Sequence, residues 1–141
     1  MPVPTSFHQK RTRRKPGNIL MKSQKVVAVI DDDPIILKAI TRLLKVHGFR
    51  SKVFASAEAF LESAFQIDVG CLVLDIHLDG MSGIELAESL KACNSGTPIV
   101  FVTAAIDEET RQRATKAGCV AYLSKPFSAK LLIAAIDKVT G

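Results

Sequence analysis

Short apolar runs rich in β-branched residues alternate with amphipathic stretches from about Lys25 to the end of the chain. Such runs predict buried strands, because strands covered on both faces read as near-continuous apolar segments. The stretches between them carry apolar residues three and four positions apart, which is typical of helices with one buried face. We therefore expect strands at residues 26–30, 50–54, 71–74, 98–102 and 120–123, each followed by a helix.

Each predicted helix begins at a residue that favours a helix start. Proline fits the first helical position, and a Ser or Asp side chain can accept hydrogen bonds from the free amides of the first turn. The residues in these positions are Pro34, Ser56, Ser82, Asp107 and Ser128. Gly48 and Gly118 follow two of the helices, where glycine commonly ends a helix. The expected apolar faces include His47, Ala64 and Cys93.

Five strands and five helices in strict alternation predict an α/β fold, a doubly wound parallel sheet with helices on both faces. The 141 residues suffice for one domain, and the chain has no internal repeat. No apolar run approaches the roughly 20 residues of a membrane span, and the N-terminus lacks the apolar core of a signal peptide. Three cysteines without a CxxC pair argue against a disulfide framework or a zinc module. These features predict a cytoplasmic protein without a membrane segment.

The basic character of the chain is concentrated at its N-terminus. The formal net charge is +5, yet residues 1–25 hold seven Lys or Arg side chains and no Asp or Glu. Residues 26–141 hold twelve basic and fourteen acidic side chains. With Lys25 added, the predicted domain, residues 25–141, is still slightly acidic. Residues 1–24 lack apolar periodicity, which predicts a disordered basic tail. Such a tail is either an arm for nucleic acid or an acidic partner, or an extension without function that precedes a later start at Met21. The extension without function is favoured, because the sign of charge alone is weak evidence for a binding arm.

Polar and charged side chains follow the predicted strands directly. In open parallel sheets, ligands bind beyond the carboxyl ends of the strands, where the strand order reverses. We therefore expect the side chains at these positions to converge on one edge of the sheet. They are Asp31, Asp32 and Asp33 after the first strand, Asp75 after the third, Thr103 and Ala104 after the fourth, and Ser124, Lys125 and Pro126 after the fifth.

The carboxylates of this set predict a metal site. Two unit charges about 4 Å apart repel by roughly 4 kcal/mol at an effective dielectric of about 20, so clustered carboxylates need a cation or a shared proton. An incomplete set of oxygen ligands suits Mg²⁺, which keeps waters and commonly bridges to phosphoryl oxygens. One carboxylate could then attack phosphorus and hold the phosphoryl group as an acyl phosphate. Thr103 could donate to a phosphoryl oxygen, and Lys125 could neutralise another.

Five motifs, in order and with similar spacing, resemble those of a receiver domain of a two-component response regulator. They are Val29-Ile30-Asp31-Asp32-Asp33-Pro34, Leu72-Val73-Leu74-Asp75-Ile76-His77-Leu78, Met81-Ser82-Gly83, Val102-Thr103-Ala104 and Tyr122-Leu123-Ser124-Lys125-Pro126-Phe127. The resemblance covers the chain from about residue 25 to residue 141. It implies a flavodoxin-like (βα)5 fold of the chemotaxis-regulator type, with strand order 2-1-3-4-5.

The resemblance also implies a role for several of these residues. Asp75 would be the phosphoacceptor. Asp31 and Asp32 would form the acidic pair that holds Mg²⁺, Asp32 as the more direct ligand. Asp75 itself and the backbone carbonyl of His77 would complete the protein ligands.

Further residues would act on the phosphoryl group or respond to it. Thr103 and Tyr122 would form a switch pair, in which Thr103 moves toward the phosphoryl group and Tyr122 turns inward. Lys125 would contact the acceptor and then the phosphoryl group, its direction set by a cis bond before Pro126. Ala104 would leave access to the phosphorus because its side chain is small.

Two positions near the acceptor differ among receivers. Asp79 stands where many receivers have Pro, and its charge could weaken phosphorylation or favour Mg²⁺. His77 falls at a variable position thought to influence the lifetime of the phosphoryl group, and its imidazole is expected to face solvent because Mg²⁺ prefers oxygen. The helix near residues 107–117 has only Ala114 and Ala117 for the core, so we expect it to be weakly anchored and able to shift.

The resemblance predicts a phosphoprotein of a phosphorelay rather than a turnover enzyme. A single-domain response regulator would accept its phosphoryl group from a histidine kinase or a histidine phosphotransfer protein. It would then change its affinity for a downstream target. A homodimer through the last two helices and fifth strand is a further possibility. The alternative is a receiver-like docking module that binds a partner without phosphorylation. A phosphatase or a flavin protein is disfavoured, because the chain has no P-loop or GxGxxG pattern and no cap domain. The sequence identifies neither the cognate kinase nor the target.

Overall fold

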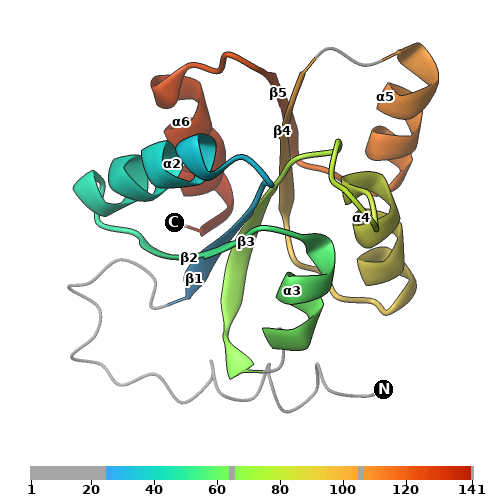
Figure 1. Ribbon diagram of the computed structural model, residues 1–141, viewed down its shortest axis with the longest axis horizontal. Helices are drawn as coiled ribbons and strands as arrows, with labels where there is room; N and C mark the ends of the chain where they lie inside the picture. Colours follow the sequence, from blue (N-terminus) through green and yellow to red (C-terminus); the bar gives the residue numbers. More distant parts are fainter. Residues whose placement is uncertain (1–24, 64–65, 105–106, 141) are drawn as a thin grey trace.

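A computed structural model gives the structure of residues 25–63, 66–104 and 107–140. Within these residues, five strands alternate with five helices (Figure 1). In chain order they are β1 (Val26–Ile30), α2 (Pro34–Val46), β2 (Arg50–Phe54), α3 (Ala57–Ser63), β3 (Val69–Leu74), α4 (Gly83–Ala92), β4 (Ile99–Thr103), α5 (Glu108–Lys116), β5 (Ala121–Ser124) and α6 (Ala129–Thr140). The strands form one parallel sheet in the order β2-β1-β3-β4-β5. This arrangement confirms the predicted flavodoxin-like fold.

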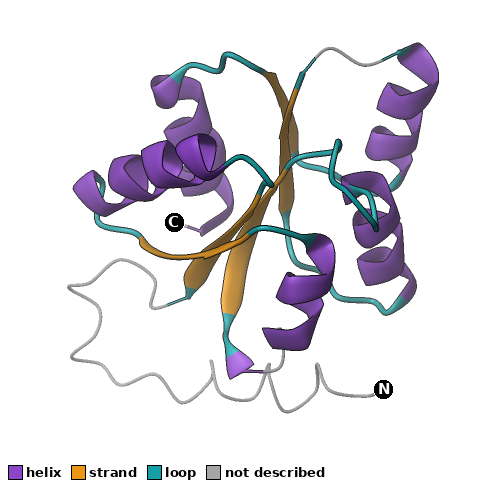
Figure 2. Cartoon of the chain, viewed as in Figure 1, coloured by secondary structure: helices purple, strands orange, loops and turns teal. Residues whose placement is uncertain are grey.

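Helices cover both faces of the sheet, so that the strands form a layer between them (Figures 1 and 2). α2 and α6 pack through Ile40, Leu44 and Leu132 on one face, and α3, α4 and α5 pack on the other. α5 contributes only Ala114 to the buried core, in agreement with its predicted weak anchoring, because stabilisation grows with buried apolar area. No helix in the described part of the chain has both the length and the apolar character needed to cross a membrane.

The residues predicted to start helices occupy those positions. Pro34 is the first residue of α2. The side chains of four capping residues each accept a hydrogen bond from the amide three residues later, at 2.8–3.2 Å. These residues are Ser56, Ser82, Asp107 and Ser128. The first turns of four helices are therefore fixed by side chains adjacent to them in sequence.

Two residues expected on apolar helix faces are exposed instead. His47 and Cys93 are the C-cap residues of α2 and α4, so the predicted helical period was extended one residue too far. The chain turns immediately afterwards, at Gly48 and at Asn94, which both have a positive φ. Ala64 and the predicted basic tail, residues 1–24, lie outside the described residues.

Three strands differ from their predicted bounds by one or two residues. β3 begins at Val69, two residues earlier than predicted, and β4 and β5 each begin and end one residue later. Pro98 was predicted as the first residue of β4 but lies just before it, because proline has no amide hydrogen to donate to a neighbouring strand. Its carbonyl still accepts a hydrogen bond from the Leu72 amide at 2.9 Å. The predicted existence and order of the strands were correct, and only their ends differ.

The parallel register brings the carboxyl ends of the strands to one edge of the sheet. Ile30 at the end of β1 pairs with Leu74 at the end of β3. Thr103 at the end of β4 pairs with Ser124 at the end of β5. The residues that directly follow paired strands therefore lie next to one another at this edge, as the sequence predicted.

The burial of Cys71 leads to a simple test of the fold. Cys71 on β3 is fully buried, which raises the pKa of its thiol to about 12, whereas Cys93 is exposed. Because the thiolate is the reactive form, we expect an aromatic disulfide reagent at mildly alkaline pH to label Cys93 rapidly and Cys71 only after unfolding. Mass spectrometry of peptides over time measures both rates, with a Cys93→Ser variant to remove the fast phase. Equal labelling of both residues in the native protein would contradict the burial of β3.

Candidate functional site

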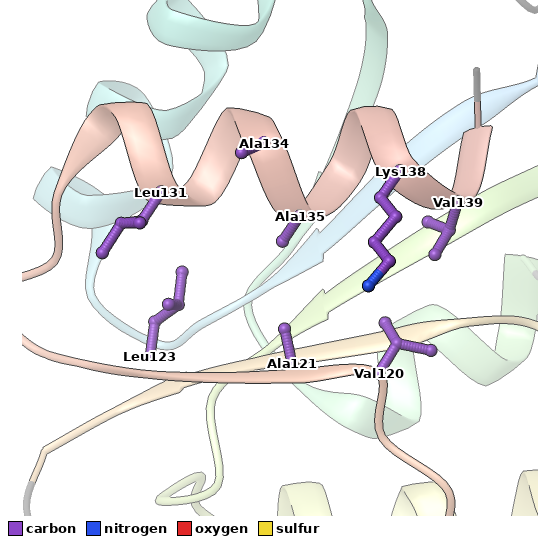
Figure 3. A pocket seen from close by; sticks show the side chains of 8 residues that line it. All are labelled: Val120, Ala121, Leu123, Leu131, Ala134, Ala135, Lys138 and Val139. Atoms are coloured by element: carbon purple, nitrogen blue, oxygen red, sulfur yellow. The ribbon is translucent and has the colours of Figure 1, made fainter.

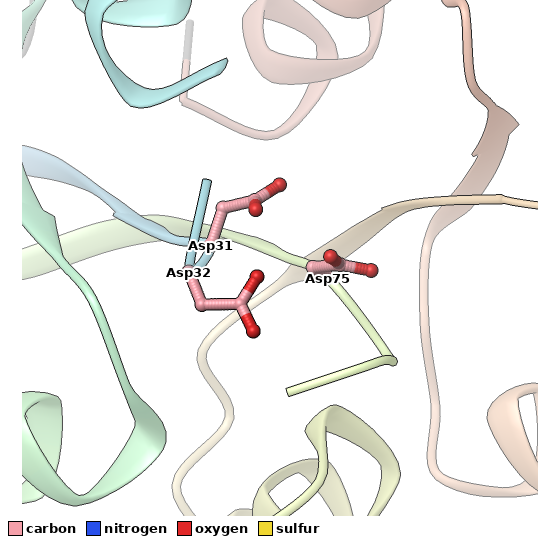
Figure 4. A group of neighbouring side chains, drawn as sticks. All are labelled: Asp31, Asp32 and Asp75. Atoms are coloured by element: carbon pink, nitrogen blue, oxygen red, sulfur yellow. The ribbon is translucent and has the colours of Figure 1, made fainter. Parts of the chain in front are cut away.

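Three carboxylates gather at the carboxyl edge of the sheet. Asp31 follows β1, Asp75 follows the neighbouring strand β3, and Asp32 is the next residue after Asp31. One carboxylate oxygen from each lies within 4.8 Å of the other two, and the three side chains are close neighbours in Figure 4. Asp31 and Asp75 are only 3% and 5% exposed, whereas Asp32 is open to solvent. Two buried carboxylates and one accessible carboxylate thus share one site.

Backbone hydrogen bonds fix the two buried carboxylates. The Asp75 amide donates to the Ile30 carbonyl at 3.0 Å, which continues the pairing of β3 with β1 beyond the last ladder residue. The Asp75 carboxylate accepts from the His77 amide at 3.1 Å, and that of Asp31 accepts from the Asp33 amide at 2.9 Å. Each side chain is therefore held by the turn that follows its own strand.

Lys125 connects the two buried carboxylates. Its Nζ donates to Oδ2 of Asp31 at 2.8 Å and to Oδ2 of Asp75 at 3.2 Å. Its amide donates to the Thr103 carbonyl at 2.8 Å, which ties the turn after β5 to the end of β4. Burial lowers the pKa of Lys125, but the hydrogen bonds and charges of the two carboxylates outweigh this effect, and the net shift is upward. The ammonium therefore stays charged between them.

The site carries more negative charge than Lys125 can balance. Burial is the largest influence on the Asp31 carboxyl and raises its pKa, and the charge of Asp75 raises it further. The hydrogen bonds from Lys125 and the Asp33 amide oppose this shift without cancelling it. Counted by their formal charges, the three carboxylates and the one ammonium sum to −2. A divalent cation would neutralise this excess.

Two hydroxyl groups are buried on the strands that complete this edge. Thr103 ends β4 and is fully buried, and Tyr122 lies on β5 with its phenolic oxygen buried. Within the described residues, neither hydroxyl has a hydrogen-bond partner. Burial raises the pKa of Tyr122, and the guanidinium carbon of Arg111 lies 5.9 Å from the centre of its ring. A buried hydroxyl without a partner costs about 1–3 kcal/mol, so each can gain from a new acceptor.

The remaining sequence-predicted residues border the carboxylates. The side chain of His77 is exposed, as expected, and its amide contacts Asp75. Ala104 is exposed and presents only a methyl group. The bond between Lys125 and Pro126 is cis, as the resemblance implied.

Three contacts near the site were missed by sequence reasoning. Glu58 accepts a hydrogen bond from the Met81 amide, Arg111 lies against Tyr122, and Gly83 packs against the main chain of Asp75. Gly83 alone had a signal in the sequence. Glycine is unfavourable inside a helix, so its presence directly after the capping Ser82 can indicate close backbone approach.

A separate apolar groove lies between the edge strand β5 and α6 (Figure 3). It shares no residue with the carboxylate cluster, and Lys138 is its one charged lining residue. The lining residues are Val120, Ala121, Leu123, Leu131, Ala134, Ala135, Lys138 and Val139. The groove involves two of the elements named for a homodimer contact in the sequence analysis, and that contact stays a prediction.

Comparisons with known sequences agree with this architecture. The sequence profile of the response regulator receiver domain matches residues 27–137. The response regulator protein TmoT of Ectopseudomonas mendocina is 34% identical over 128 residues, which cover 88% of this chain and 58% of that protein. The transcriptional regulatory protein FixJ of Rhizobium meliloti is 34% identical over 114 residues, covering 81% of this chain and 56% of FixJ.

Solved structures give the same result. The response regulator StyR superposes with a TM-score of 0.77 at 42% identity, covering 84% of this chain and 60% of that one. The crystal structure of FixJ-N gives a TM-score of 0.76 at 33% identity, covering 84% of this chain and 94% of that one. The Vibrio cholerae chemotaxis protein CheY4, at 22% identity and a TM-score of 0.75 over 83% of this chain and 99% of its own, shares the fold.

The fold and the acidic edge define a receiver-type α/β protein, and the chain belongs to the response regulator receiver domain family. Receiver domains are signalling modules of two-component systems. The chain spans little more than half the length of the curated relatives TmoT and FixJ.

Proposed function

We propose that the chain accepts a phosphoryl group on Asp75 in a Mg²⁺-dependent reaction and thereby changes its affinity for a partner protein. The observation that carries the proposal is the Lys125 ammonium, which contacts the buried carboxylates of Asp31 and Asp75 at 2.8 and 3.2 Å. Asp32 adds an accessible carboxylate within 4.8 Å. Helix capping and turn formation would explain each of these residues singly, but not the clustering of three carboxylates around one ammonium group.

The donor set suits Mg²⁺. Carboxylate oxygens are hard ligands, and an incomplete oxygen set leaves positions for water and for phosphoryl oxygens. The formal charge of −2 on the cluster matches a divalent ion in magnitude. We assign Asp31, Asp32, Asp75 and the backbone carbonyl of His77 as the groups that would hold it. When bound, Mg²⁺ supplies positive charge that neutralises the phosphoryl oxygens.

Asp75 is the group proposed to form the covalent bond. Its carboxylate oxygen attacks phosphorus, an O–P bond forms, and the bond between phosphorus and the donor breaks, so that its electron pair leaves with the donor. Lys125 then donates to a phosphoryl oxygen instead of the ionised acceptor. The Thr103 hydroxyl, buried and without a partner among the described residues, donates to another phosphoryl oxygen.

The response is proposed to pass through Thr103 and Tyr122 to α5. Thr103 would move toward the phosphoryl group, and Tyr122 would fill the space behind it. The small methyl group of Ala104 keeps the path to Asp75 open. α5 contributes only one buried side chain and contacts Tyr122 through Arg111, so it is the helix best suited to shift.

The biological setting follows from the family. We propose a cytoplasmic phosphorelay protein that acts as a phosphoacceptor rather than as a turnover enzyme. The donor would be a histidine kinase or a histidine phosphotransfer protein, and the output a protein target whose affinity changes. The receiver would extend over residues 25–141, with residues 1–24 as a basic tail.

Phosphorylation of the purified chain tests this function directly. We expect acetyl phosphate to add one phosphoryl group in the presence of Mg²⁺ and none after chelation by EDTA, with mass spectrometry placing the group on the peptide that contains Asp75. Because Tyr122 is the one tyrosine and the chain has no tryptophan, Mg²⁺ and beryllofluoride should also change its intrinsic fluorescence. Labelling elsewhere, or labelling that ignores EDTA, would contradict the proposal.

A further inference from the structure

Glu58 makes a hydrogen bond that connects α3 to the loop following Asp75. Glu58 lies in the first turn of α3, and its Oε2 accepts a hydrogen bond from the Met81 amide at 2.8 Å. The two residues are 23 positions apart in the sequence. In this bond a main-chain amide donates to a charged acceptor, which makes it stronger than a bond between neutral groups. The bond to Met81 lowers the pKa of Glu58, so the carboxylate is ionised at neutral pH.

Gly80 allows the loop to approach this carboxylate. A Cβ atom on Gly80 would lie 2.6 Å from Oε2 and 3.3 Å from Cδ of Glu58. Gly80 also has a φ of +73°, which L side chains rarely adopt. The positive φ calls for glycine at this position, and the absent side chain also leaves room for the end of the flexible Glu58 side chain. Two independent features of the loop, an amide and a missing side chain, face the same carboxylate.

The loop between Asp75 and α4 has separate anchors at its two ends. Near the start, the His77 amide donates to the Asp75 carboxylate at 3.1 Å. At the end, the Gly83 amide donates to the Ile76 carbonyl at 3.0 Å. Glu58 holds the main chain between these points. The segment that carries His77 is therefore held by Asp75 on its N-terminal side and by the hydrogen bond to Glu58 of α3 on its C-terminal side.

We propose that Glu58 is a positioning residue, whose carboxylate fixes the loop after Asp75 and thereby sets the place of the His77 carbonyl at the metal site. This inference rests on the proposed function, because the His77 carbonyl is one of the groups assigned to Mg²⁺ there. Glu58 touches neither the metal nor the phosphoryl group in this role. It acts as outer-shell partners of metal ligands do, by restricting the ligand to a productive position.

The test compares Glu58→Ala with Glu58→Gln. Gln keeps an oxygen acceptor at nearly the same place but has no charge, whereas Ala removes the acceptor. We expect Glu58→Ala to weaken Mg²⁺ binding about tenfold, at the lower end of the effects of outer-shell partners because Glu58 is exposed. Glu58→Gln should remain within about threefold of wild type, since most of the hydrogen bond survives. Tyr122 fluorescence during a Mg²⁺ titration gives the dissociation constants, and the labelling rate with acetyl phosphate gives a second readout.

Glu62→Ala is the matched control. Glu62 is an exposed glutamate one turn further along α3, so its removal changes the charge of the same helix. We expect Mg²⁺ binding within about twofold of wild type and thermal unfolding similar to that of Glu58→Ala. Equal losses in the Ala variants at 58 and 62, or an equal loss in Glu58→Gln and Glu58→Ala, would mean that charge rather than position matters and would overturn the proposal.

The outcome for wild type separates this inference from the proposed function. If the wild-type chain neither binds Mg²⁺ nor becomes labelled, both the proposed function and the proposed role of Glu58 are wrong. If the wild-type chain does both and Glu58→Ala behaves identically, the role of Glu58 alone is overturned. An NMR shift of the His77 amide in Glu58→Ala, absent from Glu62→Ala, would support displacement of the loop.

Discussion

Replacing Asp75 with Asn is expected to abolish Mg²⁺-dependent labelling by acetyl phosphate. The amide has nearly the shape of the carboxylate but is a poor nucleophile, so no acyl phosphate can form at this position. Its oxygen can still accept the hydrogen bond from the His77 amide, and Lys125 keeps its shorter contact with Asp31. The loss should therefore reflect the missing nucleophile rather than a collapsed site.

The stability of this variant provides a check on that interpretation. Asp75 raises the pKa of Asp31 by charge repulsion, so Asn at position 75 relieves part of the excess negative charge. We expect the free energy of unfolding to stay within about 1 kcal/mol of wild type, because the weaker hydrogen bond from Lys125 is offset by the loss of repulsion between the carboxylates of Asp31 and Asp75. Urea unfolding measures this difference.

Asp79→Asn is the matched control for Asp75→Asn. Asp79 is an exposed aspartate in the same loop and carries the same charge, but it is absent from the group of carboxylates that lie within 4.8 Å of one another. The Asp79 variant should retain labelling, with a rate that reports how much its charge affects the reaction. Labelling that persists in Asp75→Asn, or that disappears in both variants, would contradict the assignment of Asp75 as the acceptor.

The closeness of the carboxylates could be predicted from the sequence, because strand order and strand ends largely determine it. Asp31 and Asp75 each follow the last residue of a buried strand, and parallel pairing aligns Ile30 with Leu74 just before them. Once the two strands are neighbours, their following residues must be close. An error of one or two residues at the start of a strand, as at β3, does not move its carboxyl end.

The contacts of Glu58 and Arg111 could not be predicted in the same way. Both residues are exposed on helices, and an acidic residue in a first turn, such as Glu58, is explained by the helix dipole alone. Whether its side chain also reaches a loop 23 residues away depends on the helix position and on the rotamer, which no local pattern records. His47 and Cys93 show a related limit, because the helical period continued past the point where a left-handed turn ended the helix.

Replacing Gly83 with Ala is expected to destabilise the fold by about 3 kcal/mol or more. This exceeds the usual cost of overpacking, because the atoms that the new methyl group would meet belong to the main chain and cannot rotate away. A Cβ at Gly83 would lie 2.1 Å from the Asp75 carbonyl oxygen and 2.8 Å from the Ile76 Cα. Both are main-chain atoms. At an exposed position inside a helix, replacing Gly with Ala would instead stabilise the protein by about 1 kcal/mol. The sign of the change in unfolding free energy therefore tests whether Gly83 packs against the main chain. Chemical denaturation with urea gives the free energy of unfolding.

Gly96→Ala separates the clash from the general cost of losing a glycine. Gly96 has a φ of +71°, but a Cβ there would meet no atom within 4 Å, so Ala should cost only about 1–2 kcal/mol from backbone strain. To accommodate Ala at position 83, α4 must move away from β3, which strains the hydrogen bond between the Gly83 amide and the Ile76 carbonyl. That movement pulls on the main chain of Asp75 itself. Gly83→Ala should therefore lose phosphoryl labelling even where it remains folded, whereas Gly96→Ala should retain it. A Gly83→Ala protein with wild-type stability and labelling would show that α4 does not pack against the acceptor strand as described.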